Sequence, residues 1–113
     1  MAGALIERGQ FVVVAMQGDH SKPRPAIVVQ SNLFAALPSV AVCPLTTTLR
    51  DGADLLRLDI EPSPGNGLRA PSQIIIDKIT TVAASKIGGI VGAADDALMR
   101  RVNQALVVFL GLV

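Results

Sequence analysis

The chain has 113 residues, with ten Lys or Arg, nine Asp or Glu and a formal net charge of +1. This length predicts one domain over residues 1–113, and the small net charge excludes nucleic-acid binding through a strong overall field. Half of the residues are hydrophobic even before the ten glycines are added, which is more than a small domain buries alone, so a homodimer is expected.

Neither end of the chain carries a recognisable targeting signal. The start, "MAGALIERGQ", lacks the apolar core and the cleavage site of a signal peptide. The apolar end, "ALVVFLGLV", falls well short of the roughly 20 residues that span a bilayer. A cytoplasmic location is therefore expected.

Five runs rich in Val and Ile predict β-strands. They are bounded by Gly, Pro, Asp and Asn and cover residues 10–16, 25–30, 39–45, 55–61 and 72–82. The run at 55–61 partly alternates, as a half-exposed strand does, whereas the others are almost continuously apolar. Continuous apolar runs indicate strands that are covered on both faces. The predicted architecture is mainly β, a small barrel whose wall also carries a helix or a dimer partner.

From Asp95 onward the apolar spacing changes to that of a helix. Asp95 and Asp96 stand where a helix N-terminus favours carboxylates. The face predicted to pack on the barrel consists of Leu98, Val102, Ala105, Leu106 and Phe109. Elsewhere, "NLFAALP" at 32–38 predicts one helical turn, and the glycines of "GGIVG" at 88–92 are interpreted as turns.

No metal or cofactor site is predicted. One His, one Cys and scattered carboxylates give no zinc-ligand spacing and no magnesium cluster. "GNG" is too short to cradle a phosphate, and "GGIVG" lacks a strand-to-helix context. Cys43, in "VAVCPL", is interpreted as a buried strand thiol, since a catalytic thiol would require a neighbouring base. Any chemistry is expected to use side chains alone.

The densest polar segment is "DHSKPRPAIVV" at residues 19–29, with His20, Lys22 and Arg24. Pro25 biases Arg24 toward an extended backbone, so its side chain is expected to leave the barrel at the rim. A guanidinium fork suits phosphate oxygens, and a stiff anchor lowers the entropy lost on binding. An ordinary solvated loop remains the alternative interpretation.

A run of three threonines and one aspartate are further candidates. Thr46, Thr47 and Thr48 follow the strand at 39–45 and are either turn formers or hydroxyl donors that grip a phosphate together with Arg24. Asp77 stands inside the apolar run at 72–82, where a carboxylate must be paired. Its expected partner is a cation, and structural and functional roles for Asp77 are both open.

The order of "RGQFVVV", "KPRPAIVVQSNLF", "VCPLTT" and "SQIIIDKITTVAASKIGGIVGAADDALMRRVNQALVVFLGL" resembles the MazF/PemK family of toxins. The resemblance runs over nearly the whole chain, and Arg-Pro before an apolar strand is its most specific element. It implies an SH3-like β-barrel with a C-terminal helix, of the MazF/PemK/CcdB type, and a homodimer. It also implies a cognate antitoxin and metal-independent cleavage of single-stranded RNA.

The resemblance places the catalytic roles on Arg24, Thr46 and Asp77, and His20 aligns loosely with the loop histidine of certain relatives. Ile75 stands where some members have an arginine, which is a departure from the family pattern. The implied reaction is attack of a 2′-hydroxyl on the neighbouring phosphorus, which leaves a cyclic phosphate and a 5′-hydroxyl. Arg24 and Thr46 are expected on the phosphate, and His20 or Asp77 is expected to move the proton.

The RNA contacts are expected from Lys22, Thr47, Thr48 and Phe34. The chain has no Trp or Tyr and three Phe, so base stacking, worth roughly 1–3 kcal/mol per base, is scarce. Phe34 is the one expected stacking platform.

Two other functions fit parts of the sequence. Relatives of the CcdB type poison DNA gyrase through the end of the terminal helix, which here reads "VVFLGLV". A peptide-binding module without catalysis would need aromatic grooves, which this chain lacks. The ribonuclease interpretation is preferred because a gyrase poison does not need Arg24 at the rim.

Overall fold

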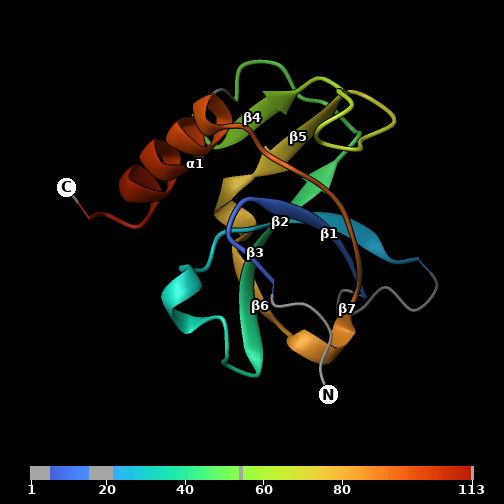
Figure 1. Ribbon diagram of the computed structural model, residues 1–113. Coiled ribbons are helices and arrows are strands. Elements are labelled where there is room, and N and C mark those ends of the chain that lie inside the picture. Colours follow the sequence, from blue (N-terminus) through green and yellow to red (C-terminus); the bar gives the residue numbers. More distant parts are fainter. Residues whose placement is uncertain (1–5, 16–21, 54, 113) are drawn as a thin grey trace.

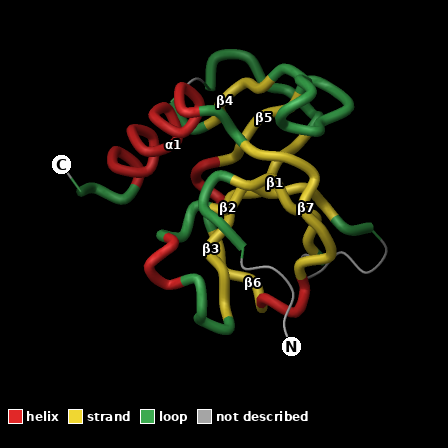
Figure 2. Tube along the Cα trace, in the orientation of Figure 1, coloured by secondary structure: helices red, strands yellow, loops and turns green. Residues whose placement is uncertain are grey.

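The computed structural model describes residues 6–15, 22–53 and 55–112. Its elements are β1 (Gln10–Val14), β2 (Arg24–Val28), η1 (Asn32–Phe34), β3 (Ser39–Thr46), β4 (Arg57–Ile60), β5 (Ser72–Ile75), η2 (Ile76–Lys78), β6 (Thr80–Ala83), η3 (Ala84–Lys86), β7 (Ile87–Ala93) and α1 (Asp96–Phe109). The fold is mainly β with a C-terminal helix, as predicted (Figures 1 and 2).

β3 is the strand around which the sheet is organised. One edge of β3 pairs with β2, whereas the other edge pairs first with β6 and then, at Leu45 and Thr46, with β5. The resulting antiparallel sheet has seven strands in the order β4-β5-β3-β2-β1-β7, with β6 beside β3. Among the described strands the sheet is strongly curved but not closed, because its path ends at β4 and at β7. The predicted barrel-like architecture is confirmed in this open form.

The apolar strands have one core on each face. Alternate side chains point to opposite faces, so neighbours in sequence join different cores. The core beneath α1 includes Phe11, Ile27, Cys43, Leu45, Leu58 and Ile74. The core enclosed by the curved sheet consists of Val12, Val14, Ala26, Val28, Val40 and Val42. This confirms that the continuous apolar runs mark strands covered on both faces.

α1 begins and packs largely as predicted. The Asp95 carboxylate accepts a hydrogen bond from the Leu98 backbone N–H at 2.8 Å and so caps the helix. The buried side chains of α1 are those of Leu98, Val102, Ala105 and Leu106. The prediction for Phe109 is wrong: it is 40% exposed, since the last turn of α1 extends beyond the sheet toward the C-terminus (Figure 1).

The run at 72–82 is not one strand. It forms β5, the 3-10 turn η2 and then β6, because β5 and β6 share the same edge of β3. Ile76 stays in the core, where its N–H donates to the Leu56 carbonyl at 2.8 Å. Asp77 turns outward and is exposed. The expectation of a buried carboxylate that must be paired is therefore wrong.

The glycines at 88–92 lie in a strand, not in turns as the sequence suggested. β7 pairs with β1, for example Phe11 with Gly92. A Cβ on Gly92 would lie 2.3 Å from the carbonyl carbon of Asn66, and Ala93 N–H donates to the Gly65 carbonyl at 3.0 Å. Glycine is thus required where the loop after β4 crosses β7 at close range.

Gly67 provides a test of this close crossing. Its φ is +70°, and an added Cβ would lie 2.0 Å from the Val91 carbonyl oxygen. Gly67→Ala should therefore lower the free energy of unfolding by more than about 1 kcal/mol. Urea denaturation measures this loss. Gly52→Ala is the matched control, because Gly52 has a φ of +76° but no atom within 4 Å of its Cβ position. Equal losses in the two variants would contradict the role of the Val91 contact.

Candidate functional site

A row of polar side chains crosses four neighbouring strands. Thr46 in β3 pairs with Gln73 in β5, which in turn pairs with Asp59 in β4. On the other side of β3, Ala26 of β2 pairs with Pro44. Continuing this register by two residues sets Arg24 opposite Thr46. Directly opposed residues of antiparallel strands point to the same face. Arg24, Thr46, Gln73 and Asp59, which we call the polar row, therefore share the face of the sheet opposite to α1.

Arg24 is exposed at the first position of β2 and pairs with Val14 of β1. Pro25, the next residue, fixes φ and stiffens the backbone that carries the guanidinium. Lys22 is exposed two residues earlier. The predicted proton carrier His20 belongs to residues 16–21, which lie outside the described residues. The described cations at this end of the row are suited to an anionic ligand.

Thr46 ends β3 and is half-buried, whereas Thr47 and Thr48 are exposed. The Thr48 N–H donates to Thr46 Oγ1 at 3.0 Å. Because Oγ1 already accepts this bond, the hydroxyl proton is the group that Thr46 can offer to an anion. The turn-forming and ligand-binding interpretations of these threonines are therefore compatible.

Gln73 is a member of the row that the sequence reading missed. It is 4% exposed, and its amide bonds to the backbone of Arg50 and to the side chains of Arg57 and Asp59. A glutamine in the apolar run "SQIII" must have hydrogen-bond partners if it is buried. The sequence predicted Asp77 as the buried polar group of this run, but the buried polar group is Gln73.

Asp77 and Phe34 lie away from the polar row within one chain. η2, which carries Asp77, contacts α1 and β3, and Ile76 belongs to the core on the α1 side. Phe34 is 54% exposed in η1, and η1 follows the end of β2 opposite to Arg24 (Figure 1). From the start to the end of β3 the chain advances roughly 23 Å at about 3.3 Å per residue. Phe34 therefore cannot stack a base that sits directly on Thr46 of the same chain.

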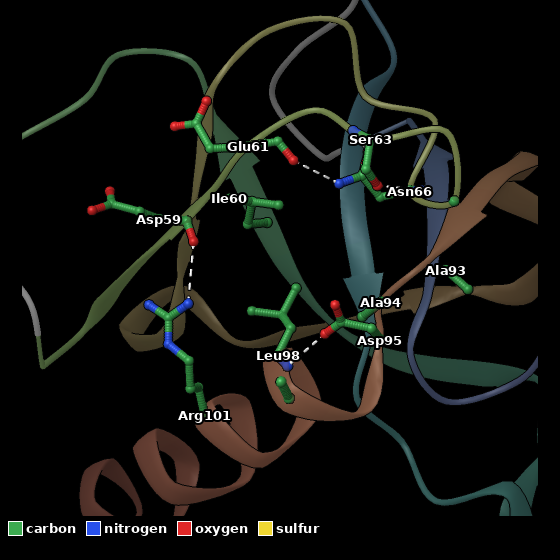
Figure 3. Close-up of a pocket in the computed structure, with 12 residues that line it drawn as sticks. Asp59, Ile60, Glu61, Ser63, Asn66, Ala93, Ala94, Asp95, Leu98 and Arg101 are labelled. Carbon is green, nitrogen blue, oxygen red and sulfur yellow. Dashed lines mark hydrogen bonds between the residues drawn. The ribbon is translucent and has the colours of Figure 1, made fainter.

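A hollow of about 540 Å³ opens between the end of β4, the loop that follows it and the start of α1. Its lining includes Asp59, Glu61 and Asp95 (Figure 3), but the Asp59 carboxylate itself accepts a hydrogen bond from Gln73 in the polar row. The Arg101 guanidinium there donates to the Asp59 carbonyl at 3.4 Å. The carboxylates of Glu61 and Asp95 outnumber the single arginine and so disfavour a phosphate backbone. Arg24 and Thr46, at one end of the polar row, are therefore the better candidates for an anion site.

Within residues 6–15, 22–53 and 55–112, no three His, Cys, Asp or Glu side chains gather as metal ligands would. No helix in this part of the chain is long and apolar enough to cross a bilayer.

Comparison with known proteins identifies the family. The matching family model is the PemK-like, MazF-like toxin of type II toxin–antitoxin systems, and the match covers residues 7–110. The chain belongs to this toxin family. The toxin is also 43% identical over 108 residues to a protein named probable endoribonuclease MazF from Mycolicibacterium smegmatis. That alignment covers 95% of the toxin and 98% of its relative.

Solved structures agree with the family. An endoribonuclease in complex with its cognate antitoxin, from a mycobacterial species, superposes on the toxin with a TM-score of 0.79 at 26% identity. That superposition covers 96% of the toxin and 97% of the other chain. A MazE-MazF structure from Deinococcus radiodurans gives a TM-score of 0.77 at 18% identity, over 96% and 99% of the two chains. At that identity the second match supports the fold alone.

The toxin departs from some family members at Ile75, and the structure shows what surrounds this position. Ile75 is 7% exposed in β5 and pairs directly with Arg57 of β4. Arg57 alternates along β4 with Leu58 and therefore points to the same face as Asp59. A guanidinium is thus present beside the polar row, although it comes from β4 and not from β5.

Cys43 of the toxin is a buried strand thiol, as the sequence predicted. It is fully buried in β3, and burial raises the pKa of its thiol from 9.0 to about 12. Since only the thiolate reacts, a thiol reagent at pH 8 should modify Cys43 no faster than the toxin unfolds. Absorbance with a chromogenic disulfide measures the rate, and unfolding in guanidinium should release the thiol at once. Rapid modification of the folded toxin would contradict this placement.

The same pKa shift predicts a loss of stability in alkali. The unfolded thiol ionises near pH 9 and the folded thiol near pH 12, so the unfolded state binds fewer protons between these values. The free energy of unfolding should therefore fall as pH rises through this window. Cys43→Ser, compared by denaturant titration at pH 8 and pH 10, should show a weaker fall.

Proposed function

We propose that this toxin is an endoribonuclease that cuts single-stranded RNA at short sequences without a metal. The supporting observation is the polar row, which aligns Arg24 and Thr46 on one face of two adjacent strands. The relative that is 43% identical is named a probable endoribonuclease, and the structure with a TM-score of 0.79 is described as an endoribonuclease. We take the whole chain, residues 1–113, as the functional domain.

The proposed reaction is an intramolecular transfer at phosphorus. The RNA 2′-oxygen forms a bond to phosphorus while the bond from phosphorus to the 5′-oxygen breaks. The proton of the 2′-hydroxyl passes to a base, and the leaving 5′-oxygen takes up a proton. The products are a cyclic phosphate and a free 5′-hydroxyl, and no oxidant or cofactor is consumed.

Arg24 and Thr46 stabilise the charge that develops on phosphorus. The guanidinium presents two parallel donors to the non-bridging oxygens, and the Thr46 hydroxyl proton supplies another. The base is His20 or Asp77 in this proposal. Asp77 is exposed but lies in η2, away from the polar row of the same chain. It reaches the same phosphate only if the RNA path bends or if Asp77 is supplied by a second chain. His20 precedes Arg24 by only four residues in the sequence.

The proposed RNA contacts are Lys22, Thr47, Thr48 and Phe34, all of which are exposed. Lys22 and the two threonines flank Arg24 and Thr46 in sequence, so they would hold the nucleotides beside the cut. Phe34, at the far end of β2, would stack a distant base or a base held by the partner chain.

The proposed partners are a second copy of the toxin and a cognate antitoxin. Exposed apolar side chains gather at the end of α1, where Val108, Phe109, Leu110 and Leu112 are 40–70% exposed. Exposed apolar side chains in this number favour association with protein. The relative with a TM-score of 0.79 was solved with its antitoxin. The gyrase alternative has no such support, because the matching family model is PemK/MazF.

The purified, antitoxin-free toxin should be incubated with mixed single-stranded RNA in EDTA, and the cut ends should be sequenced. The proposal expects cuts at a short repeated sequence, with the same pattern when magnesium is added. Intact RNA, from toxin shown to be folded, would overturn the proposal. A parallel gyrase supercoiling assay should show no inhibition.

A further inference from the structure

The Gln73 amide holds the backbone of Arg50 at two points. Gln73 Oε1 accepts from the Arg50 N–H at 3.1 Å, and Nε2 donates to the Arg50 carbonyl at 3.0 Å. This is the pairing that a residue of a neighbouring strand would make, although β3 has already ended at Thr46. The Gln73 side chain thus takes the place of a neighbouring strand for the segment that follows Thr46.

Two residues of β4 complete this arrangement. Gln73 Nε2 donates to Asp59 Oδ1 at 2.8 Å, and Arg57 Nη1 donates to Gln73 Oε1 at 3.3 Å. A rotated amide would place a donor against the Arg57 donor and an acceptor against the Asp59 carboxylate, so the partners fix its orientation. Arg57 Nη1 also donates to the Thr48 carbonyl at 3.2 Å. We call Gln73, Arg57 and Asp59 the amide clamp.

The amide clamp fixes the segment from Thr46 to Arg50 at successive points. Thr46 is held by its strand pairing with Gln73, Thr48 by Arg57 and by its bond to Thr46 Oγ1, and Arg50 by the Gln73 amide. The direction of Thr46 Oγ1 is therefore set by the conformation of this turn. A displacement of about 1 Å in a positioned group can cost 10²-fold in rate, so a fixed turn matters for a reacting hydroxyl.

We propose that Gln73 is a positioning residue, which holds the Thr46–Arg50 turn so that the Thr46 hydroxyl meets the same phosphate as Arg24. This inference rests on the proposed ribonuclease function. Gln73 acts through Thr46 and touches no substrate. A glutamine is required because only a side-chain amide offers both the donor and the acceptor that the Arg50 backbone needs. A carboxylate at position 73 would lose both donors and would face Asp59.

Gln73→Met keeps the length of the side chain and removes its four hydrogen bonds. The matched control is Asn66→Ala, since Asn66 is 7% exposed and also holds a loop, by bonds to Glu61, Ser63 and Leu68. Both variants should be assayed on one RNA at a temperature where circular dichroism shows them folded. Gln73→Met should lower kcat by roughly 10²-fold with little change in KM. Asn66→Ala should leave kcat near the wild-type value.

A rescue experiment tests the clamp partner. Gln73→Glu should lower kcat because the new carboxylate faces Asp59 Oδ1. Adding Asp59→Asn should recover part of kcat, since the new amide can donate to position 73. Asp59→Asn alone should lower kcat less than Gln73→Glu does, because its amide oxygen can still accept from Gln73. A wild-type kcat in Gln73→Met, or equal losses in Gln73→Met and Asn66→Ala, would overturn the positioning role.

Amide hydrogen exchange separates this inference from the proposed function. The Arg50 and Thr48 N–H groups should exchange faster in Gln73→Met than in the wild type and should be unchanged in Asn66→Ala. This readout needs no RNA, so an inactive wild-type protein would end the ribonuclease proposal while the clamp remained testable. Unchanged exchange at both amides in Gln73→Met would overturn the clamp itself.

Discussion

Arg24→Ala should lower kcat for RNA cleavage by about 10²–10³-fold, which is the usual cost of removing one preorganised donor from a developing oxyanion. Arg24 is the cation of the polar row, and continuation of the β2–β3 register sets it opposite Thr46. Pro25 stiffens its backbone, so little entropy is lost when the guanidinium binds phosphate. Because Arg24 is exposed, its removal should leave the free energy of unfolding nearly unchanged.

Two companion variants sharpen this test. Arg24→Lys keeps the positive charge but loses the planar fork, so its kcat should fall between those of the wild type and Arg24→Ala. Arg100→Ala removes an exposed arginine of α1 and should leave kcat unchanged. Single-turnover cleavage of one RNA measures all three. Full activity in Arg24→Ala would remove Arg24 from the mechanism.

Phe11→Ala should lower the free energy of unfolding by about 3–5 kcal/mol, the range measured for phenylalanine truncation in cores. Phe11 in β1 is fully buried beneath α1, where it packs in the core that contains Ile27 and Val102. Small domains are stable by about 5–15 kcal/mol, so this single change removes a large fraction of the total. Urea denaturation at one fixed protein concentration measures it.

Phe34→Ala is the matched control for Phe11→Ala. Phe34 is 54% exposed in η1, so its truncation should change the free energy of unfolding by no more than about 0.5 kcal/mol. The same variant also tests the proposed base stacking, because it should raise KM for RNA without changing kcat. A large loss of stability in Phe34→Ala would show that η1 is covered, for example by a second chain.

Much of the fold follows from the sequence because burial leaves a direct trace in residue order. The continuous apolar runs of β1 to β3 occur because each strand has a core on both faces. α1 is readable because Asp95 caps it and its buried residues recur at helical spacing. These signals are local, so a single sequence contains them.

The errors occur where a distant segment decides the local structure. β7 contains Gly88, Gly89 and Gly92, which suggest turns, yet the requirement for Gly92 comes from the loop at Asn66. The bend at η2 exists because β5 and β6 must share one edge of β3. Neither constraint is visible in the residues of the segment itself.

The candidate site was predictable only in part. Arg24 and Thr46 were already candidates from their residue types and positions, the family resemblance gave them catalytic roles, and the register between β2 and β3 supports placing them together. Gln73 was missed because a lone glutamine in an apolar strand does not reveal that its partners are Arg50 and the side chains of β4. Asp77 was misread because the outward turn at η2 depends on strand pairing.

The central claim is that Arg24 and Thr46 of the polar row promote attack by an RNA 2′-hydroxyl. It is tested most directly with two synthetic RNAs that contain one mapped cleavage site and differ by a single 2′-deoxy nucleotide on the 5′ side of the cut. In EDTA, the toxin should cut the all-RNA strand to a cyclic phosphate and a 5′-hydroxyl and leave the deoxy-substituted strand intact. Cleavage of the substituted strand, or a 5′-phosphate on the product, would contradict the account.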